Sequence, residues 1–158
     1  MRTATPSPSA TGGQARAFVG LAADPTNALH VFAATVGGLR ETDPASPDPL
    51  HDWRDVTLPA AAAGQLAAVT VTSDRVVVIA APAGLFWSPI PTAGNPWNFT
   101  TNAAVARSCT DVEWVTGGVV AAAAGAPGNP ASPPNPAVPP TPPALFRGEW
   151  NPATGTFA

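Results

Sequence analysis

Residues Val76–Trp87 read VVVIAAPAGLFW, and residues His30–Glu41 read HVFAATVGGLRE. The two segments align without a gap at an offset of 46 residues, so that Leu85 falls on Leu39. In each segment, a run rich in strand-forming residues leads into a Gly-marked turn and a second short run. A period of about 40 to 50 residues is typical of repeat architectures, so each segment is interpreted as the central hairpin of a repeated unit.

A third copy of the hairpin is interrupted. Its apolar half is VVAAAAG at residues 119–125, its Gly-Leu half is matched by ALFRGEW at residues 144–150, and a Pro-rich insert occupies 126–143. In all three copies a leucine precedes an aromatic residue by twelve or fourteen positions, which predicts a short strand, a turn and an aromatic that opens the next strand. These repeat positions are Leu39 and Trp53, Leu85 and Trp97, and Leu145 and Phe157. We expect the aromatics to pack between neighbouring units.

Each unit has one more strand candidate before its hairpin, bounded by Asp, Pro, Asn, Ser or Gly. The expected strands are 17–23, 28–35, 38–42 and 53–58, then 65–72, 75–81, 84–88 and 97–101, then 109–115, 118–124, 144–149 and 156–158. A helix competes for the Ala-rich segments 58–69 and 119–125, because alanine is the best helix former. Pro59, Gly64 and the paired valines favour a loop in the first segment and a strand in the second.

These units predict an all-β fold, a β-propeller-like repeat of four-stranded antiparallel blades. The blades span about 17–58, 65–101 and 105–158, the third is incomplete, and residues 1–16 form a disordered leader. A β-sandwich is the alternative, but it requires about seven strands and no repeat. Propellers have about 4 to 8 blades and an open strand edge invites pairing, so we expect a homo-oligomer or part of a longer propeller.

The closing turn of each unit resembles the Asp-box, or BNR, repeat of sialidase-like and Vps10-like β-propellers, whose motif is approximately Ser/Thr-x-Asp-x-Gly-x-x-Trp. Gly94–Trp97 fits the second half of the motif but has no Asp before it. Glu41–Pro44 followed by Trp53 is a stretched form, and Asn151–Phe157 keeps the turn and an aromatic. The resemblance covers about 17–158 and implies a structural motif, in which a turn carboxylate binds backbone N–H groups and the aromatic packs between blades.

The chain of 158 residues has a net charge of -3, and 11% of its residues are charged. A negative chain without a basic stripe does not attract nucleic acid or an anionic membrane, and no apolar run reaches the length of a membrane span. The polar N-terminus lacks the apolar segment of a signal peptide, so we expect a cytoplasmic protein. Neither a Gly-rich phosphate loop nor a zinc-binding spacing is present, so we expect no cofactor and no metal site.

No residue cluster in the sequence specifies a catalytic site. The sialidase mechanism needs a tyrosine nucleophile, and the chain has no Tyr. Other glycosidases use two facing carboxylates, but most acids here lie in turn contexts where such side chains cap backbone groups. The candidates are Asp24, Asp43, Asp52, Asp55, Asp74, Asp111 and Glu113. We expect Cys109 to be a buried, inert thiol and His51 to be a lone surface side chain.

Trp87 and Trp150 lie at less regular positions than the other tryptophans and, with Arg147, are the candidate ligand-binding residues, because aromatic rings can stack on sugars. Burial in the core is the alternative for both rings. The insert at 126–143 is expected to be an extended solvent loop. The sequence therefore favours a non-catalytic binding or interaction module for a protein or glycan partner. The alternative is a fragment or subunit of a sialidase-like glycoside hydrolase whose catalytic residues lie elsewhere.

Overall fold

The computed structural model describes residues 18–92, 96–101, 108–115, 118–123, 144–151, 154 and 156–157. All regular elements within these residues are β-strands, and none is a helix. This confirms the all-β class. The Ala-rich segment that begins at residue 119, for which a helix was the alternative, forms a strand as far as Ala123. The leader at 1–16 and the insert at 126–143 lie outside the described residues.

Two antiparallel sheets have four strands each, in chain order. Sheet 1 contains β1 (Phe18–Asp24), β2 (Asn27–Thr35), β3 (Gly38–Thr42) and β4 (Trp53–Asp55). Sheet 2 contains β5 (Ala68–Val71), β6 (Val76–Ala81), β7 (Gly84–Pro89) and β8 (Thr100–Thr101). Consecutive strands pair in both sheets, so each sheet is the four-stranded meander that the repeat predicts.

The central hairpins of the two sheets turn in the same register. Thr35 pairs with Gly38 in sheet 1, and Ala81 pairs with Gly84 in sheet 2. The two glycines have φ angles of 125° and 133°, a region that residues with a Cβ seldom adopt. The repeated glycine is therefore required by the turn.

The third unit is divided between two sheets. Sheet 3 has the order β11-β10-β9 and contains β9 (Cys109–Val115), β10 (Gly118–Ala123) and β11 (Ala144–Gly148). A separate two-stranded sheet pairs β12 (Trp150–Asn151) with β13 (Thr156–Phe157). The last strand of this unit thus pairs with β12 and not with β11, which differs from the expected four-stranded blade.

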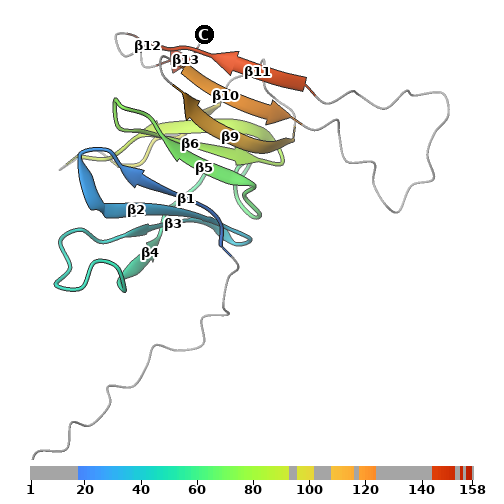
Figure 1. The fold of residues 1–158 in the computed structure, drawn as a ribbon. Helices are drawn as coiled ribbons and strands as arrows, with labels where there is room; N and C mark the ends of the chain where they lie inside the picture. The colour runs from blue at the N-terminus through green and yellow to red at the C-terminus, as the bar shows by residue number, and fades with distance from the viewer. Residues whose placement is uncertain are drawn as a thin grey trace, which may run out of the picture.

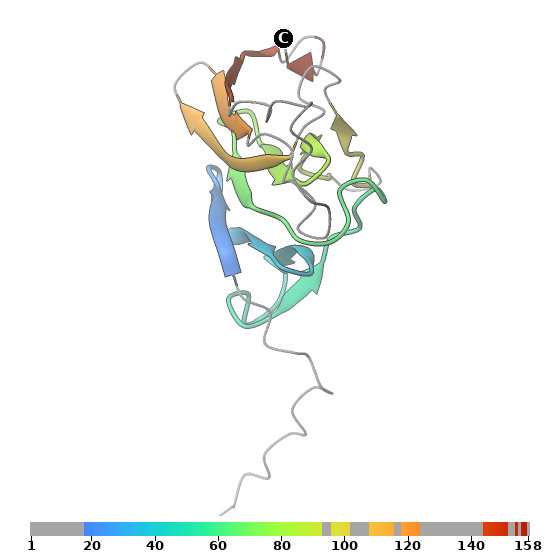
Figure 2. The same ribbon diagram turned by 90° about the vertical axis from the view of Figure 1, so that its right-hand side faces the viewer.

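The three larger sheets are stacked in chain order, as Figures 1 and 2 show from two directions. β1 packs beside β5, and β5 packs beside β9. One hydrophobic cluster joins sheets 1 and 2, and a second joins sheets 2 and 3. Sheet 2 is therefore covered on both faces, which explains why all six residues of β6 are apolar and buried. The described strands do not close into a ring.

Sheets 1 and 2 turn equivalent faces toward the sheet that follows each of them. Phe32, Ala34 and Leu39 lie in the cluster between sheets 1 and 2. Their equivalents 46 positions later lie in the cluster between sheets 2 and 3: Val78, Ala80 and Leu85. The repeat therefore governs how the sheets pack as well as the order of their strands.

Candidate functional site

The repeat leucines and Trp97 have different environments along the stack. Leu39 and Leu85 are buried, whereas Leu145 is 75% exposed. Trp97 is half-buried against the first cluster, with its ring stacked on that of Phe99 at 5.4 Å. Trp97 thus packs beside the contact between sheets 1 and 2, whereas the ring of Trp53 lies against Phe18 of its own sheet, with the ring centroids 5.7 Å apart.

Trp53 and Trp97 are not equivalent in the strand ladders. Trp53 lies opposite Thr42 in sheet 1. The ladder of β7 and β8, continued by one residue, places Phe99 opposite Ser88, which is the repeat equivalent of Thr42. The residue of sheet 2 that corresponds to Trp53 in the ladder is therefore Phe99, two residues after Trp97. The loop before β8 is longer than the twelve-residue spacing from Leu85 to Trp97 indicates.

Among the candidate ligand residues from the sequence, the two with described side chains, Trp87 and Arg147, have different surroundings. Trp87 is 4% exposed and belongs to the cluster between sheets 2 and 3, so its ring offers no surface to a ligand. Arg147 is exposed on β11. The backbones of Trp150 and Phe157 pair with each other, while their side chains lie outside the described part of the chain.

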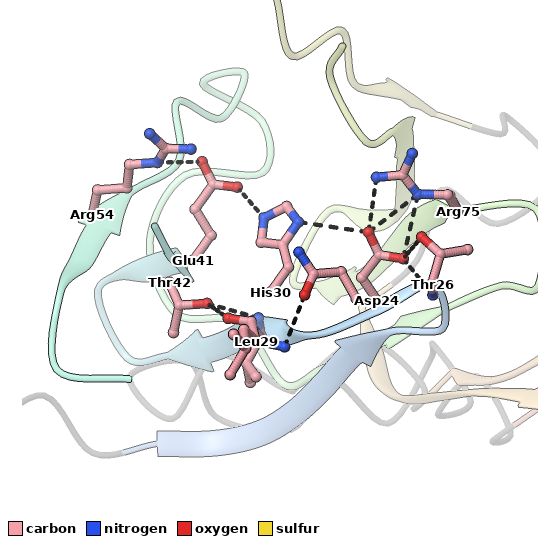
Figure 3. Close-up of polar contacts among 10 residues, drawn as sticks. Asp24, Thr26, Leu29, His30, Glu41, Thr42, Arg54 and Arg75 are labelled. Carbon is pink, nitrogen blue, oxygen red and sulfur yellow. Dashed lines mark hydrogen bonds and ion pairs between the residues drawn. The ribbon is translucent and has the colours of Figure 1, made fainter. Parts of the chain in front are cut away.

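An ion pair between the buried carboxylate of Asp24 and the partly exposed guanidinium of Arg75 links sheets 1 and 2 (Figure 3). The Asp24 side chain is fully buried, and its Oδ2 accepts hydrogen bonds from Arg75 Nη2 at 2.8 Å and Nε at 3.1 Å. Asp24 Oδ1 also accepts from the backbone N–H of Thr26 at 2.9 Å and from its hydroxyl at 2.8 Å. One carboxylate thus closes the turn between β1 and β2 and attaches it to the turn before β6.

His30 extends this ion pair into a longer polar network. Its Nδ1 lies 3.6 Å from Asp24 Oδ2, and its Nε2 lies 2.9 Å from Glu41 Oε2. The other Glu41 oxygen accepts a hydrogen bond from Arg54 Nε at 2.9 Å. Figure 3 shows the resulting series of side chains, which runs from Arg54 through Glu41, His30 and Asp24 to Arg75.

Strand alternation explains why these polar side chains are buried. His30 lies two residues before Phe32 on β2, and Glu41 lies two residues after Leu39 on β3, so each points to the same face as a core residue. The sequence interpretation did not assign His30 or Glu41 to a site. The alternation was the signal that could have found them.

The carboxylates of this network are held in their charged form. Burial alone would raise the pKa of Glu41, but the hydrogen bond with His30 and the charge of Arg54 outweigh it and lower the pKa below its usual value. Burial likewise opposes the charge of Asp24, and the hydrogen bonds from Arg75 and Thr26 lower its pKa overall.

A pocket of about 500 Å³ opens beside Glu41, between sheet 1 and the loop that joins β7 to β8. It is lined by His30, Glu41, Arg54, Thr57, Pro91, Pro96 and Trp97. The Arg54 side chain is 54% exposed, whereas that of Glu41 is 7% exposed. The pocket thus combines an aromatic ring, a solvent-accessible guanidinium and a carboxylate that already has two partners.

No protein-family model matches the chain, and no curated protein matches it. What the pocket can bind therefore follows from its own geometry. Within the described ranges, no three side chains of His, Cys, Asp or Glu are grouped so as to hold a metal ion. The same ranges contain no helix that is long and apolar enough to cross a membrane.

The contacts of Cys109, His51 and Asp43 are those of residues that stabilise the fold. Cys109 is 2% exposed in the second cluster, and burial raises the pKa of its thiol. His51 is exposed, and the hydrogen bond between its Nδ1 and Asp48 Oδ1 at 2.8 Å raises its pKa. Asp43 accepts a hydrogen bond from the backbone N–H of Ala45 at 3.0 Å, as a capping carboxylate does.

Proposed function

We propose that this chain is a non-catalytic binding module of the β-propeller type, and that the pocket beside Glu41 binds a glycan. The proposal depends on one observation: the open pocket of about 500 Å³ beside Glu41 joins an aromatic wall to polar side chains held in place by ion pairs. Concave sites with apolar walls and a few oriented polar groups are the usual form of small-ligand sites.

Trp97 supplies the aromatic wall. Its ring stacks on Phe99 at 5.4 Å and forms a T-shaped contact with Phe32 at 5.8 Å, so its orientation is set before a ligand arrives. Pro91 and Pro96 extend the apolar lining. A pyranose ring has an apolar C–H face that suits such a wall, and a fixed wall loses little conformational freedom on binding.

Arg54 and Thr57 supply hydrogen bonds for the polar edge of a sugar. A guanidinium has five N–H donors, and the contacts of Arg54 with Glu41 and Asp43 use part of them. Because its side chain is 54% exposed, the remaining donors are accessible to a hydroxyl or carboxylate oxygen. The ion pair with Glu41 fixes the guanidinium at the rim of the pocket.

The state of Glu41 favours binding over hydrolysis. A glycosidase needs a carboxylic acid whose pKa is raised, together with a second carboxylate facing it. The pKa of Glu41 is lowered, and Glu41 is the one carboxylate among the described residues that line the pocket. The described lining of this pocket therefore lacks a glycosidase acid pair, and the alternative function, part of a sialidase-like glycoside hydrolase, would need its catalytic residues elsewhere.

The packing of the sheets supports the propeller part of the proposal. Propeller blades are four-stranded sheets arranged around an axis. Here β1, β5 and β9, the first strands of the three sheets, follow one another side by side. The hydrogen bond from Ala45 to Asp43 has the form that an Asp-box carboxylate would make.

Saturation-transfer NMR on the full chain tests the glycan site. The probes are free galactose, N-acetylglucosamine and N-acetylneuraminic acid, and we expect at least one to receive saturation from the protein. Arg54→Gln removes a charged hydrogen bond and should weaken that binding about tenfold. Arg147→Gln is the matched control on sheet 3 and should bind as the wild type does.

Two results would contradict the proposal. No saturation transfer to any of the three sugars would argue against a glycan ligand. Weaker binding in Arg147→Gln with normal binding in Arg54→Gln would move the site from the pocket to sheet 3. A circular dichroism spectrum of each variant shows whether the fold is retained.

A further inference from the structure

One repeat position is covered in two sheets and uncovered in the third. Leu39 is 1% exposed beside sheet 2, and Leu85 is 4% exposed beside sheet 3. Leu145 has the same repeat position in β11 and is 75% exposed, while its neighbour Phe146 packs toward sheet 2. The side of sheet 3 that carries Leu145, here called the tail face, is therefore the side that sheets 1 and 2 turn toward a following sheet.

The opposite end of the stack also has exposed apolar side chains. Leu21 in β1 is 62% exposed, and Leu29 in β2 is 47% exposed. Leu21 pairs with Ala33 in sheet 1. The equivalent pair in sheet 2 is Val69 with Ile79, and Val69 is 6% exposed because sheet 1 covers it.

The side of sheet 1 that carries Leu21 and Leu29, here called the head face, is thus equivalent to the side of sheet 2 that packs on sheet 1. Head and tail faces are the two halves of a contact that the chain already makes twice, between sheets 1 and 2 and between sheets 2 and 3. The tail face also carries Asp111, Glu113 and Arg147, which share the side of Leu145 in the ladders of sheet 3 and are exposed, so a contact there would be partly polar. Both halves are present in every copy of the chain.

We propose that the head face of one copy of this chain binds the tail face of a second copy, and that two copies close into a ring. The contact is head-to-tail, because each copy contributes a different face to it, and such contacts either close or continue as filaments. A two-fold axis covers both faces of both copies at once. The ring would contain six of the larger sheets, three from each copy, within the range of about 4 to 8 known for propellers.

Light scattering combined with size exclusion tests this proposal on the full chain. We expect the wild type to have twice the mass of one chain at micromolar concentration. Leu21→Glu on the head face and Leu145→Glu on the tail face should each give the mass of one chain, because each places a charge in both contacts of the ring. Leu50→Glu is the matched control, since Leu50 is 53% exposed but lies in the loop before β4.

Mixing the two variants distinguishes a head-to-tail contact from a symmetric one. An equimolar mixture of Leu21→Glu and Leu145→Glu retains one intact pair of faces, so we expect two-chain complexes that neither variant forms alone. A wild type with the mass of one chain would overturn the proposal and leave the faces to another protein. A dimer unaffected by either variant, or a mixture that stays monomeric while the wild type is dimeric, would overturn it as well.

Discussion

Arg75 has a φ angle of 61°, in the left-handed region where a side chain costs about 1 kcal/mol. It lies in the turn before β6, where its backbone N–H donates to the carbonyl of Thr72 at 3.0 Å. Its guanidinium meanwhile binds the buried carboxylate of Asp24 in the neighbouring sheet. A glycine would suit the turn better, so the ion pair between the sheets offsets the backbone cost of an arginine here.

Two substitutions at Arg75 separate the backbone strain from the ion pair. Arg75→Ala loses the ion pair and keeps the strain, so we expect the free energy of unfolding to fall by about 2 kcal/mol or more. Arg75→Gly loses the same ion pair but relieves the strain, so its loss should be smaller by about 1 kcal/mol. Urea denaturation measures both values. A glycine variant that is no more stable than the alanine variant would show that the left-handed turn is not strained.

The lowered pKa values of Asp24 and Glu41 predict how stability depends on pH. Their unfolded values are near 3.8 and 4.5, and their folded values are lower, so folding favours the charged forms. This contribution is complete above the unfolded pKa values and is lost as the pH falls through the folded ones. We therefore expect the free energy of unfolding to decrease from about pH 5 downward.

Asp24→Asn is the variant that tests this pH dependence. It removes one of the two titrating groups, so its unfolding free energy, measured by urea titration at a series of pH values, should decrease less steeply in acid than that of the wild type. An equally steep decrease would assign the acid sensitivity to other carboxylates. Asp111→Asn, at an exposed position of β9, is the control.

At the scale of the elements, β6 differs from the strands at the ends of the stack. All of its residues are buried, because sheets cover both of its faces. In β1, by contrast, every residue before Asp24 is exposed or partly buried, because sheet 2 covers one of its faces. Shortening any side chain of a strand buried on two faces should lower the free energy of unfolding. In a strand buried on one face, side chains on the exposed face can be shortened with little effect.

Alanine substitutions in β6 and β1 test this difference. Val78→Ala and Ile79→Ala remove neighbouring side chains from opposite faces of β6, and each should lower the free energy of unfolding by about 1 to 4 kcal/mol. Leu21→Ala in β1 should change it by less than about 0.5 kcal/mol when single chains predominate. Thermal and urea denaturation provide the values. If Val78→Ala or Ile79→Ala had no effect, one face of sheet 2 would be open.

Much of this element structure could be predicted from the sequence, because local chemistry determines it. The run at 76–81 is a strand because its residues are branched or small, and Gly84 is required by the turn that follows. The same signals at 30–41 predict the equivalent hairpin of sheet 1. Both hairpins form between segments adjacent in the chain, so no distant contact is needed to specify them.

The candidate site could not be predicted in the same way. The pair of Asp24 and Arg75 joins residues 51 positions apart and exists because sheets 1 and 2 are stacked. The pocket likewise combines β2 and β3 with the loop between β7 and β8. Alternation does place His30 in phase with Phe32, but it does not reveal that Glu41 is its partner. The split third unit also depends on pairing between distant segments, which local patterns do not determine.

At the scale of the whole molecule, the central claim is that the sheets repeat one packing contact and leave its two halves open at the ends. Leu39, Leu85 and Leu145 are equivalent in the repeat, and the first two are covered by a following sheet. The cost of shortening a leucine depends on how much contact the lost atoms made. The stability lost on shortening each of these three leucines therefore shows directly whether a following sheet covers it.

Urea denaturation of Leu39→Ala, Leu85→Ala and Leu145→Ala, at dilutions where single chains predominate, tests this claim most directly. We predict losses in the free energy of unfolding of about 2 to 5 kcal/mol for the first two variants. For Leu145→Ala we predict a change of less than about 0.5 kcal/mol. Equal losses at all three positions, or the largest loss at Leu145, would contradict the stacked arrangement.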